Sequence, residues 1–145
     1  MRSEDAVYGG EMSAHHYFKD FFYCDSGMVP WLLIAELVIS LDMPISELVG
    51  EYIKQFPASG EINSKVNDPE QLMARIESLY QSEAESIDYT DGLSVNFSEW
   101  RFNVRKSNTE PLVRLNVESK SNVELMRAKT KELLNLISSE LIEAT

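Results

Sequence analysis

The feature that most constrains the fold is an alternation of apolar and polar residues along positions 93–118. Apolar side chains recur at every second position of three successive segments: Leu93, Val95 and Phe97, then Trp100, Phe102 and Val104, then Val113, Leu115 and Val117. Successive side chains of a strand point to opposite faces, so the pattern predicts antiparallel strands with one buried face. Asp91-Gly92 precedes the first segment and favours a tight hairpin turn, because both residues accept positive φ angles.

Two helical segments in the same part of the chain can cover that buried face. The first begins at Asp68-Pro69, where an N-cap residue and a proline at the first helical position precede a glutamine at the capping-box position. The second is expected to begin at Ser121, with Glu124 at its capping-box position. With a further strand expected at 61–66, residues 57–145 are predicted to form an α+β unit. It consists of an antiparallel sheet with two helices packed on one face.

The beginning of the chain has a different pattern. Residues 6–8 are typical of the end of a strand that Gly9-Gly10 breaks, and a polar and aromatic loop comes next. The helix expected at 27–41 is apolar on nearly every side, and such a helix is normally buried on several faces. Nothing in residues 1–43 supplies a sheet to cover it. The segment is therefore either a strand-loop-helix remnant of an α/β domain or a helix docked on the downstream domain, with a linker helix at 44–56.

Composition limits the partners of this chain. The net charge of -11 opposes binding to phosphate backbones, so no nucleic-acid partner is expected. The longest apolar run, at 28–41, is interrupted by charge and proline and is too short to span a bilayer, and no signal peptide is apparent. We therefore expect no membrane partner and a cytoplasmic location. The single cysteine, Cys24, permits no internal disulfide. It is expected to be a buried bystander, with a catalytic cysteine as the alternative.

One basic turn stands out in this acidic chain, within the stretch VRKSNTEPLVR at 104–114. Strand alternation places its two arginines on the polar face of the sheet. The donors that the turn offers come from Arg105, Ser107, Asn108 and Thr109. Arginine forks, hydroxyls and successive backbone N–H groups suit a phosphoryl group. A solvated turn is the alternative, and the carboxylate of Glu110 would oppose an anion unless it points away.

A second polar cluster lies in the stretch GEMSAHHYF at 10–18. Its polar residues are Glu11, Ser13, His15 and His16. They are compatible with a sugar site, with a histidine general base, or with an ordinary surface loop. A metal site is poorly supported, because adjacent histidines rarely bind one ion and the sequence offers no third spaced ligand. No aspartate-rich loop occurs in the sequence, so no metal site is predicted.

Taken together, the two stretches resemble the α-D-phosphohexomutase family. GEMSAHHYF is similar to the sugar-recognition loop of that family, and RKSNTEP at 105–111 is similar to its C-terminal phosphate-binding loop. FPASGEINSK at 56–65 and the Asp-Gly hairpin also match, in the same order. The resemblance covers essentially the whole chain and is strongest to the bacterial phosphomannomutase branch, which supplies GDP-mannose synthesis.

The resemblance implies a four-domain isomerase that moves a phosphoryl group between O6 and O1 of a hexose through a bisphosphate. It implies magnesium as the metal of the complete enzyme and hexose 1,6-bisphosphate as its activator. By the resemblance, Glu11, Ser13 and His15 bind the sugar, and the donors of the basic turn hold the phosphate. The chain lacks the phosphoserine loop and the metal loop of the family. We therefore expect 1–43 to be the end of the third domain, 57–145 to be the complete fourth, and the chain alone to be inactive.

The expected partners are a phosphohexose substrate and the remaining domains of the same enzyme. Phosphoglucomutase is a close rival to phosphomannomutase, because both epimers can use the same hydroxyl contacts. The competing class is a stand-alone module without catalytic activity. Such a module would bind phosphosugars or associate with itself through the helix at 27–41.

Overall fold

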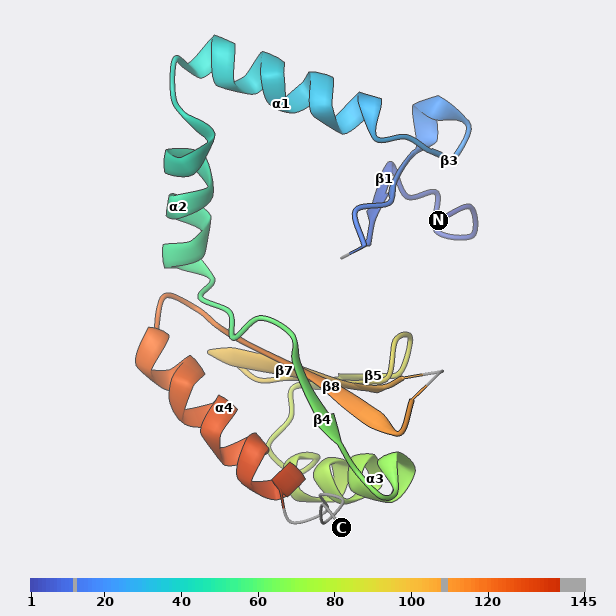
Figure 1. The fold of residues 1–145 in the computed structure, drawn as a ribbon, viewed down its shortest axis with the longest axis vertical. Helices are drawn as coiled ribbons and strands as arrows, with labels where there is room; N and C mark the ends of the chain where they lie inside the picture. The colour runs from blue at the N-terminus through green and yellow to red at the C-terminus, as the bar shows by residue number, and fades with distance from the viewer. Residues whose placement is uncertain (12, 108–109, 139–145) are drawn as a thin grey trace. The chain divides into compact units, whose positions relative to one another are not determined.

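The computed structural model describes residues 1–11, 13–107 and 110–138 (Figure 1). Asn108 and Thr109 of the expected phosphate loop lie outside the described residues. The chain forms two compact units, Met1–Val49 and Gly50–Thr145.

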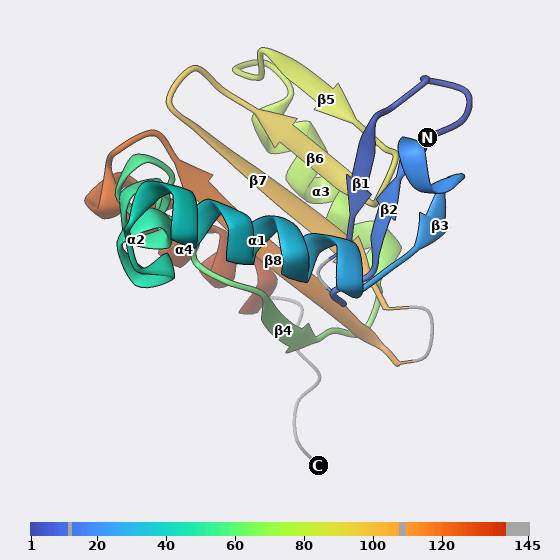
Figure 2. The ribbon, with the colours of Figure 1, turned by 90° about the horizontal axis from the view of Figure 1, so that it is seen from above.

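The second unit contains a five-stranded antiparallel sheet with the strand order β4-β8-β7-β6-β5 (Figure 2). Its strands are β4 (Ile62–Lys65), β5 (Ser86–Asp88), β6 (Leu93–Asn96), β7 (Trp100–Lys106) and β8 (Leu112–Ser119). Its helices are α3 (Pro69–Tyr80) and α4 (Val123–Ser138). The antiparallel α+β fold expected from the alternation is confirmed.

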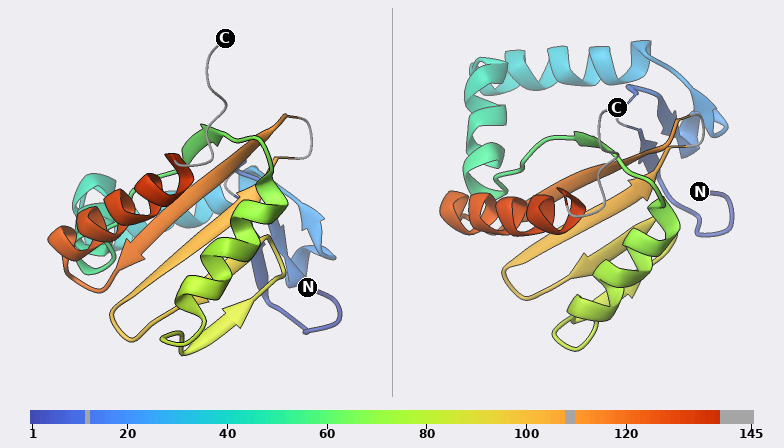
Figure 3. Two further views of the ribbon diagram at one scale, coloured as in Figure 1. Left: turned by 90° about the horizontal axis from the view of Figure 1, so that it is seen from below. Right: turned by 60° about the horizontal axis from the view of Figure 1, so that its bottom comes forward.

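Both helices cover the same face of this sheet, as the view from below shows (Figure 3). The alternating residues of β6, β7 and β8 point into the core, and Phe102, Val104 and Leu115 are almost completely buried. Leu72 and Ile76 of α3 and Leu133 and Ile137 of α4 close the core from the other side. The opposite face of the sheet carries the polar residues of each strand, and these include the two arginines of the basic turn.

The N-cap residue predicted from the sequence is correct for α3 and wrong for α4. The side chain of Asp68 caps α3 by accepting hydrogen bonds from the backbone N–H groups of Glu70 and Gln71, as expected. At α4 the expected cap, Ser121, is wrong by one residue. Asn122 takes that place, since its side-chain oxygen accepts from the N–H of Leu125.

The hairpin between β5 and β6 turns at Gly92, which has a φ angle of 75°. A Cβ atom at this position would lie 2.6 Å from the Cβ of Arg105 and 2.6 Å from the carbonyl oxygen of Val104. Glycine is therefore required here both by the backbone conformation and by the close approach of β7.

The first unit contains a small antiparallel sheet with the order β1-β2-β3. Its elements are β1 (Tyr8–Gly10), β2 (His16–Phe18), the 3-10 helix η1 (Lys19–Phe21) and β3 (Cys24–Asp25). The expectation that Gly9 and Gly10 break the first strand is wrong, because they pair with Tyr17 and His16. Part of the expected loop is therefore the second and third strands of a sheet.

Helices α1 (Met28–Leu41) and α2 (Ile45–Gln55) come next, close to their expected bounds. Neither helix has a buried residue in the described part of the chain. In α1 the exposed fraction is 62% for Trp31, 55% for Leu32 and 79% for Ile39. Within the described residues this apolar helix is thus left uncovered, which agrees with the expectation that residues 1–43 supply nothing to cover it. No helix among the described residues is both long enough and apolar enough to cross a membrane.

Candidate functional site

Two arginines face each other on the polar side of the five-stranded sheet. Arg105 of β7 and Arg114 of β8 are directly paired in the antiparallel register. Both side chains are partly exposed, to 29% and 36%. Like charges in such a pair repel each other, so the arrangement requires a nearby negative charge.

Glu61, just before β4, supplies that charge. Its Oε2 lies 3.0 Å from Nη2 of Arg105, and its Oε1 lies 3.7 Å from Nη1 of Arg114. The hydrogen bond from Arg105 is the main reason that the pKa of Glu61 lies below its ordinary value, and the charge of Arg114 acts in the same direction. Glu61 is therefore ionised at neutral pH and bridges the two guanidinium groups.

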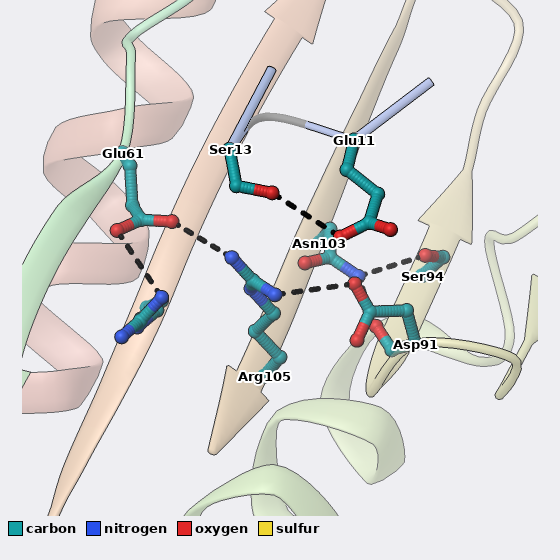
Figure 4. A network of polar contacts seen from close by, with 8 residues as sticks. Glu11, Ser13, Glu61, Asp91, Ser94, Asn103 and Arg105 are labelled. Atoms are coloured by element: carbon teal, nitrogen blue, oxygen red, sulfur yellow. Dashed lines mark hydrogen bonds and ion pairs between the residues drawn. The ribbon is translucent and has the colours of Figure 1, made fainter. Parts of the chain in front are cut away.

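A second carboxylate lies on the other side of Arg105 (Figure 4). Oδ2 of Asp91, in the β5–β6 turn, is 3.4 Å from Nη1 of Arg105. Asn103 holds this turn in place, since its Nδ2 donates to the carbonyl of Asp91 and to the hydroxyl of Ser94. The guanidinium group of Arg105 is thus oriented by two carboxylates from separate segments of the chain.

The basic turn itself is closed by local bonds. The backbone N–H of Ser107 donates to the carbonyl of Leu112, and the N–H of Glu110 donates to the Ser107 hydroxyl. Lys106 is directed to α3, where its Nζ lies 2.5 Å from Oε1 of Glu70. Glu110 is exposed. Among the described residues, Arg105 contacts the carboxylates of Glu61 and Asp91. The sequence analysis had named Glu110 as the carboxylate that could oppose an anion at this turn.

This cluster has the chemistry of an anion site. Two guanidinium groups lie beside a turn that carries a hydroxyl, and both belong to a single hairpin. Two carboxylates balance their charges. In addition, the Nε of Arg114 is buried and has no hydrogen-bond partner among the described residues. A phosphate offers several acceptor oxygens to such donors.

The expected sugar residues lie together in the first unit. The Ser13 hydroxyl donates to Oε2 of Glu11 at 3.2 Å, and the Tyr17 hydroxyl donates to Oε1 of Glu11 at 2.9 Å. That second bond is the main cause of the raised pKa of Tyr17. A carboxylate has about four acceptor sites. Glu11 therefore keeps the capacity to accept from further hydroxyl groups while its orientation is fixed.

His15 is held by a carboxylate of its own. Its Nδ1 lies 2.7 Å from Oδ2 of Asp25, and the other oxygen of Asp25 accepts from the backbone N–H of His16. The hydrogen bond raises the pKa of His15 and lowers that of Asp25. His16 is occupied separately, with its Nδ1 2.7 Å from the hydroxyl of Tyr8. The two adjacent histidines thus have different partners.

The residues that the sequence did not identify as part of these clusters are Tyr17, Asp25, Glu61 and Asp91. For Tyr17 a signal was present, since it lies in the stretch GEMSAHHYF that was singled out as the sugar loop. Glu61 lies in the family-matching stretch FPASGEINSK, but nothing local links it to Arg105, which is 44 residues away. Asp25 had no local signal, because its partner His15 is 10 residues away.

The structure adds no support for magnesium, and it contradicts the expected burial of Cys24. Among residues 1–11, 13–107 and 110–138, no three His, Cys, Asp or Glu side chains are placed to hold a metal ion. Magnesium therefore remains an implication of the family resemblance. The expectation that Cys24 is buried is wrong, because the residue is exposed at the edge strand β3.

Comparison with protein-family models gives two matches. Residues 61–134 match "Phosphoglucomutase/phosphomannomutase, C-terminal domain". Residues 1–56 match "Phosphoglucomutase/phosphomannomutase, alpha/beta/alpha domain III". The two matches include both polar clusters.

Curated relatives agree with these matches. The chain is 60% identical over 139 residues to a phosphomannomutase of Salmonella montevideo, covering 96% of this chain and 30% of the relative. It is 59% identical over 138 residues to the phosphomannomutase of Escherichia coli K12, covering 95% of this chain and 30% of the relative. It is 55% identical over 137 residues to a protein of Xanthomonas campestris named "Phosphohexose mutases", covering 94% and 31%. The chain thus spans about a third of the length of these relatives.

A solved structure shares the fold. It is a phosphoglucomutase/phosphomannomutase family protein of Burkholderia thailandensis, with a TM-score of 0.68 and 24% sequence identity. The match covers 94% of this chain and 30% of that one. The resemblance stated from the two sequence stretches is therefore confirmed, and the chain belongs to the phosphoglucomutase/phosphomannomutase family.

Proposed function

We propose that this chain is the sugar- and phosphate-binding part of a phosphomannomutase, which interconverts mannose 6-phosphate and mannose 1-phosphate through a bisphosphate intermediate. Glu11, Ser13 and His15 would bind the hexose. Arg105, Ser107, Asn108 and Thr109 would bind the phosphate group remote from the reaction. The complete enzyme would use magnesium and be activated by a hexose 1,6-bisphosphate, would act in the cytoplasm, and would serve GDP-mannose synthesis.

The observation that carries this proposal is the orientation of Arg105. Its guanidinium group lies on the open face of the sheet, next to the basic turn, and both of its carboxylate partners are at least partly exposed. Arginine in this setting binds phosphate through charge-assisted hydrogen bonds. The names of the curated relatives support mannose as the sugar of the substrate.

The proposal is tested by replacing Arg105 with alanine in a protein of the relatives' full length. We expect the apparent binding free energy of mannose 1-phosphate to weaken by about 1.5–3 kcal/mol, the scale of a hydrogen bond to a charged group. Arg101→Ala is the matched control, because Arg101 lies on the same strand and pairs with Glu118 at 3.8 Å. Unchanged KM and kcat in the Arg105 variant would remove this residue from the phosphate site.

A second experiment concerns activity of the chain alone. We expect no turnover of mannose 1-phosphate by the 145-residue chain in a coupled assay with magnesium and activating bisphosphate. The reason is that its sequence has no phosphoserine loop to donate the phosphoryl group. Turnover at the level of a full-length relative, measured side by side, would contradict this expectation.

Phosphoglucomutase is the second candidate, because the matching family models carry both activities in their description. Competition between glucose 1-phosphate and mannose 1-phosphate for the full-length protein separates the two. A kcat/KM ratio that favours the glucose epimer would assign the chain to the rival activity.

We also propose domain boundaries, with 1–43 as the end of the third domain, 44–56 as a linker and 57–145 as the fourth domain. The exposed apolar side chains of α1 would be covered by other domains in a protein of the relatives' length. In the isolated chain the same helix would promote self-association. Sedimentation at several concentrations tests this, with Trp31→Glu as the variant expected to remain monomeric.

A further inference from the structure

We propose that Glu61 is a displaceable internal carboxylate that competes with the ligand phosphate for Arg105 and Arg114 and thereby weakens phosphate binding. The inference rests on the phosphate-binding function proposed above. It goes further by giving a role to a residue that lies outside the basic turn, in the stretch FPASGEINSK at 56–65.

The geometry makes Glu61 a substitute for a phosphate. Each of its two oxygens faces a different guanidinium group, at 3.0 Å from Arg105 and 3.7 Å from Arg114. Two oxygens of a phosphate group could make the same pair of contacts. A phosphate that binds Arg105 must therefore share these donors with Glu61 or displace it.

Charge strengthens the competition. Arg105, Arg114, Glu61 and Asp91 together carry no net charge, so the cluster attracts a dianion only weakly. Neutralising Glu61 leaves a net positive charge beside the turn. Asp91 also contacts Arg105, but at 3.4 Å and with 74% of its side chain exposed, so solvent screens its charge more. Glu61, at 23% exposed, has the larger effect on the arginines.

Displacement of Glu61 is feasible because the carboxylate satisfies Arg114 only in part. In the described part of the chain the buried Nε of Arg114 has no acceptor, and its Nη1 is 3.7 Å from Glu61, beyond ordinary hydrogen-bond length. A phosphate has more acceptor oxygens than a carboxylate. Exchange of Glu61 for phosphate therefore costs few hydrogen bonds at Arg114, and the carboxylate is returned to solvent.

The experiment is a titration of the 145-residue chain with inorganic phosphate at about pH 8, where phosphate carries nearly two charges. Binding is followed by NMR through the arginine Nε–Hε and backbone amide signals. Four variants are compared with the unaltered chain: Glu61→Gln, Asp91→Asn, Glu118→Gln and Arg105→Ala. Glu118 is the matched control, since it pairs with Arg101 on the same polar face.

We expect Glu61→Gln to bind phosphate about 3- to 10-fold more tightly, the size of a screened charge interaction at a partly exposed site. Asp91→Asn should tighten binding by a smaller factor, which keeps the inference testable if Glu61→Gln unfolds. Glu118→Gln should leave the affinity unchanged. Rising salt should reduce the difference between the Glu61 variant and the unaltered chain.

The outcomes separate the two proposals. Equal or weaker phosphate binding by Glu61→Gln, with binding lost in Arg105→Ala, would overturn the competition while leaving the phosphate site intact. Equal tightening by Glu61→Gln and Glu118→Gln would show a general charge effect and would also overturn it. Binding that persists unchanged in Arg105→Ala would refute the phosphate site and, with it, the role of Glu61.

Discussion

Replacing Gly92 with alanine should destabilise the second unit by about 1–4.5 kcal/mol, through two separable effects. At a φ angle of 75° an alanine is in the left-handed region, which costs about 1–2 kcal/mol. The new Cβ would also lie 2.6 Å from the Cβ and 2.8 Å from the Cα of Arg105. Relieving such overlap by moving the backbone costs about 1–3 kcal/mol more. The lower unfolded-state entropy of alanine offsets part of the sum, by about 0.4–1 kcal/mol.

Gly60 provides the matched control for this prediction. Its φ angle is 71°, nearly that of Gly92, but a Cβ at Gly60 would have no heavy atom within 4 Å. Gly60→Ala therefore carries the conformational cost alone, about 1 kcal/mol. Asparagine tolerates the left-handed region, so Gly60→Asn should be nearly neutral, whereas Gly92→Asn should remain destabilised by the overlap.

The measurement is urea unfolding followed by tryptophan fluorescence. Trp100 is 9% exposed and reports on the core of the second unit, and a Trp31→Phe background removes the signal of the exposed tryptophan. Because the overlap moves the backbone at Arg105, Gly92→Ala should also weaken phosphate binding. Equal losses of stability in the Gly92 and Gly60 variants would refute the steric part of the reasoning.

The His15–Asp25 pair and the buried Phe102 give two further predictions. Asp25→Asn should lower the pKa of His15 toward 6.5, as measured by NMR titration, because the bond to Asp25 raises it. Because the pKa of His15 is raised in the folded state, its contribution to stability is lost as the pH rises through that pKa. Because the pKa of Asp25 is lowered, its contribution is lost as the pH falls through that pKa. The pair therefore stabilises the first unit at pH values between the pKa of Asp25 and the pKa of His15. An unchanged titration of His15 would argue against the contact. Phe102→Ala removes a side chain that is 1% exposed, so it should lower the free energy of unfolding in urea by about 3–5 kcal/mol. Phe22 is 78% exposed, so Phe22→Ala should lower that free energy by less than about 0.5 kcal/mol.

Elements encoded by neighbouring residues were predictable. The period of two in β6, β7 and β8 specified both the strands and their buried face, because strand side chains alternate whatever the sheet around them. Asp68 and Pro69 located the start of α3 for a similar reason, since a cap acts on the next three residues. The errors at Ser121 and at Gly9-Gly10 occurred where a neighbouring residue or a partner strand overrode the local preference.

The sequence by itself determined the sheet, its hairpin at Gly92 and the presence of two polar loops typical of one family, because each depends on residues close together in the chain. Only the tertiary structure decided what surrounds Arg105. Its partner Glu61 is 44 residues away and reaches it because β4 pairs with the far side of β8. That register is set by the packing of the whole sheet, so no local pattern predicts that a carboxylate lies between the two arginines.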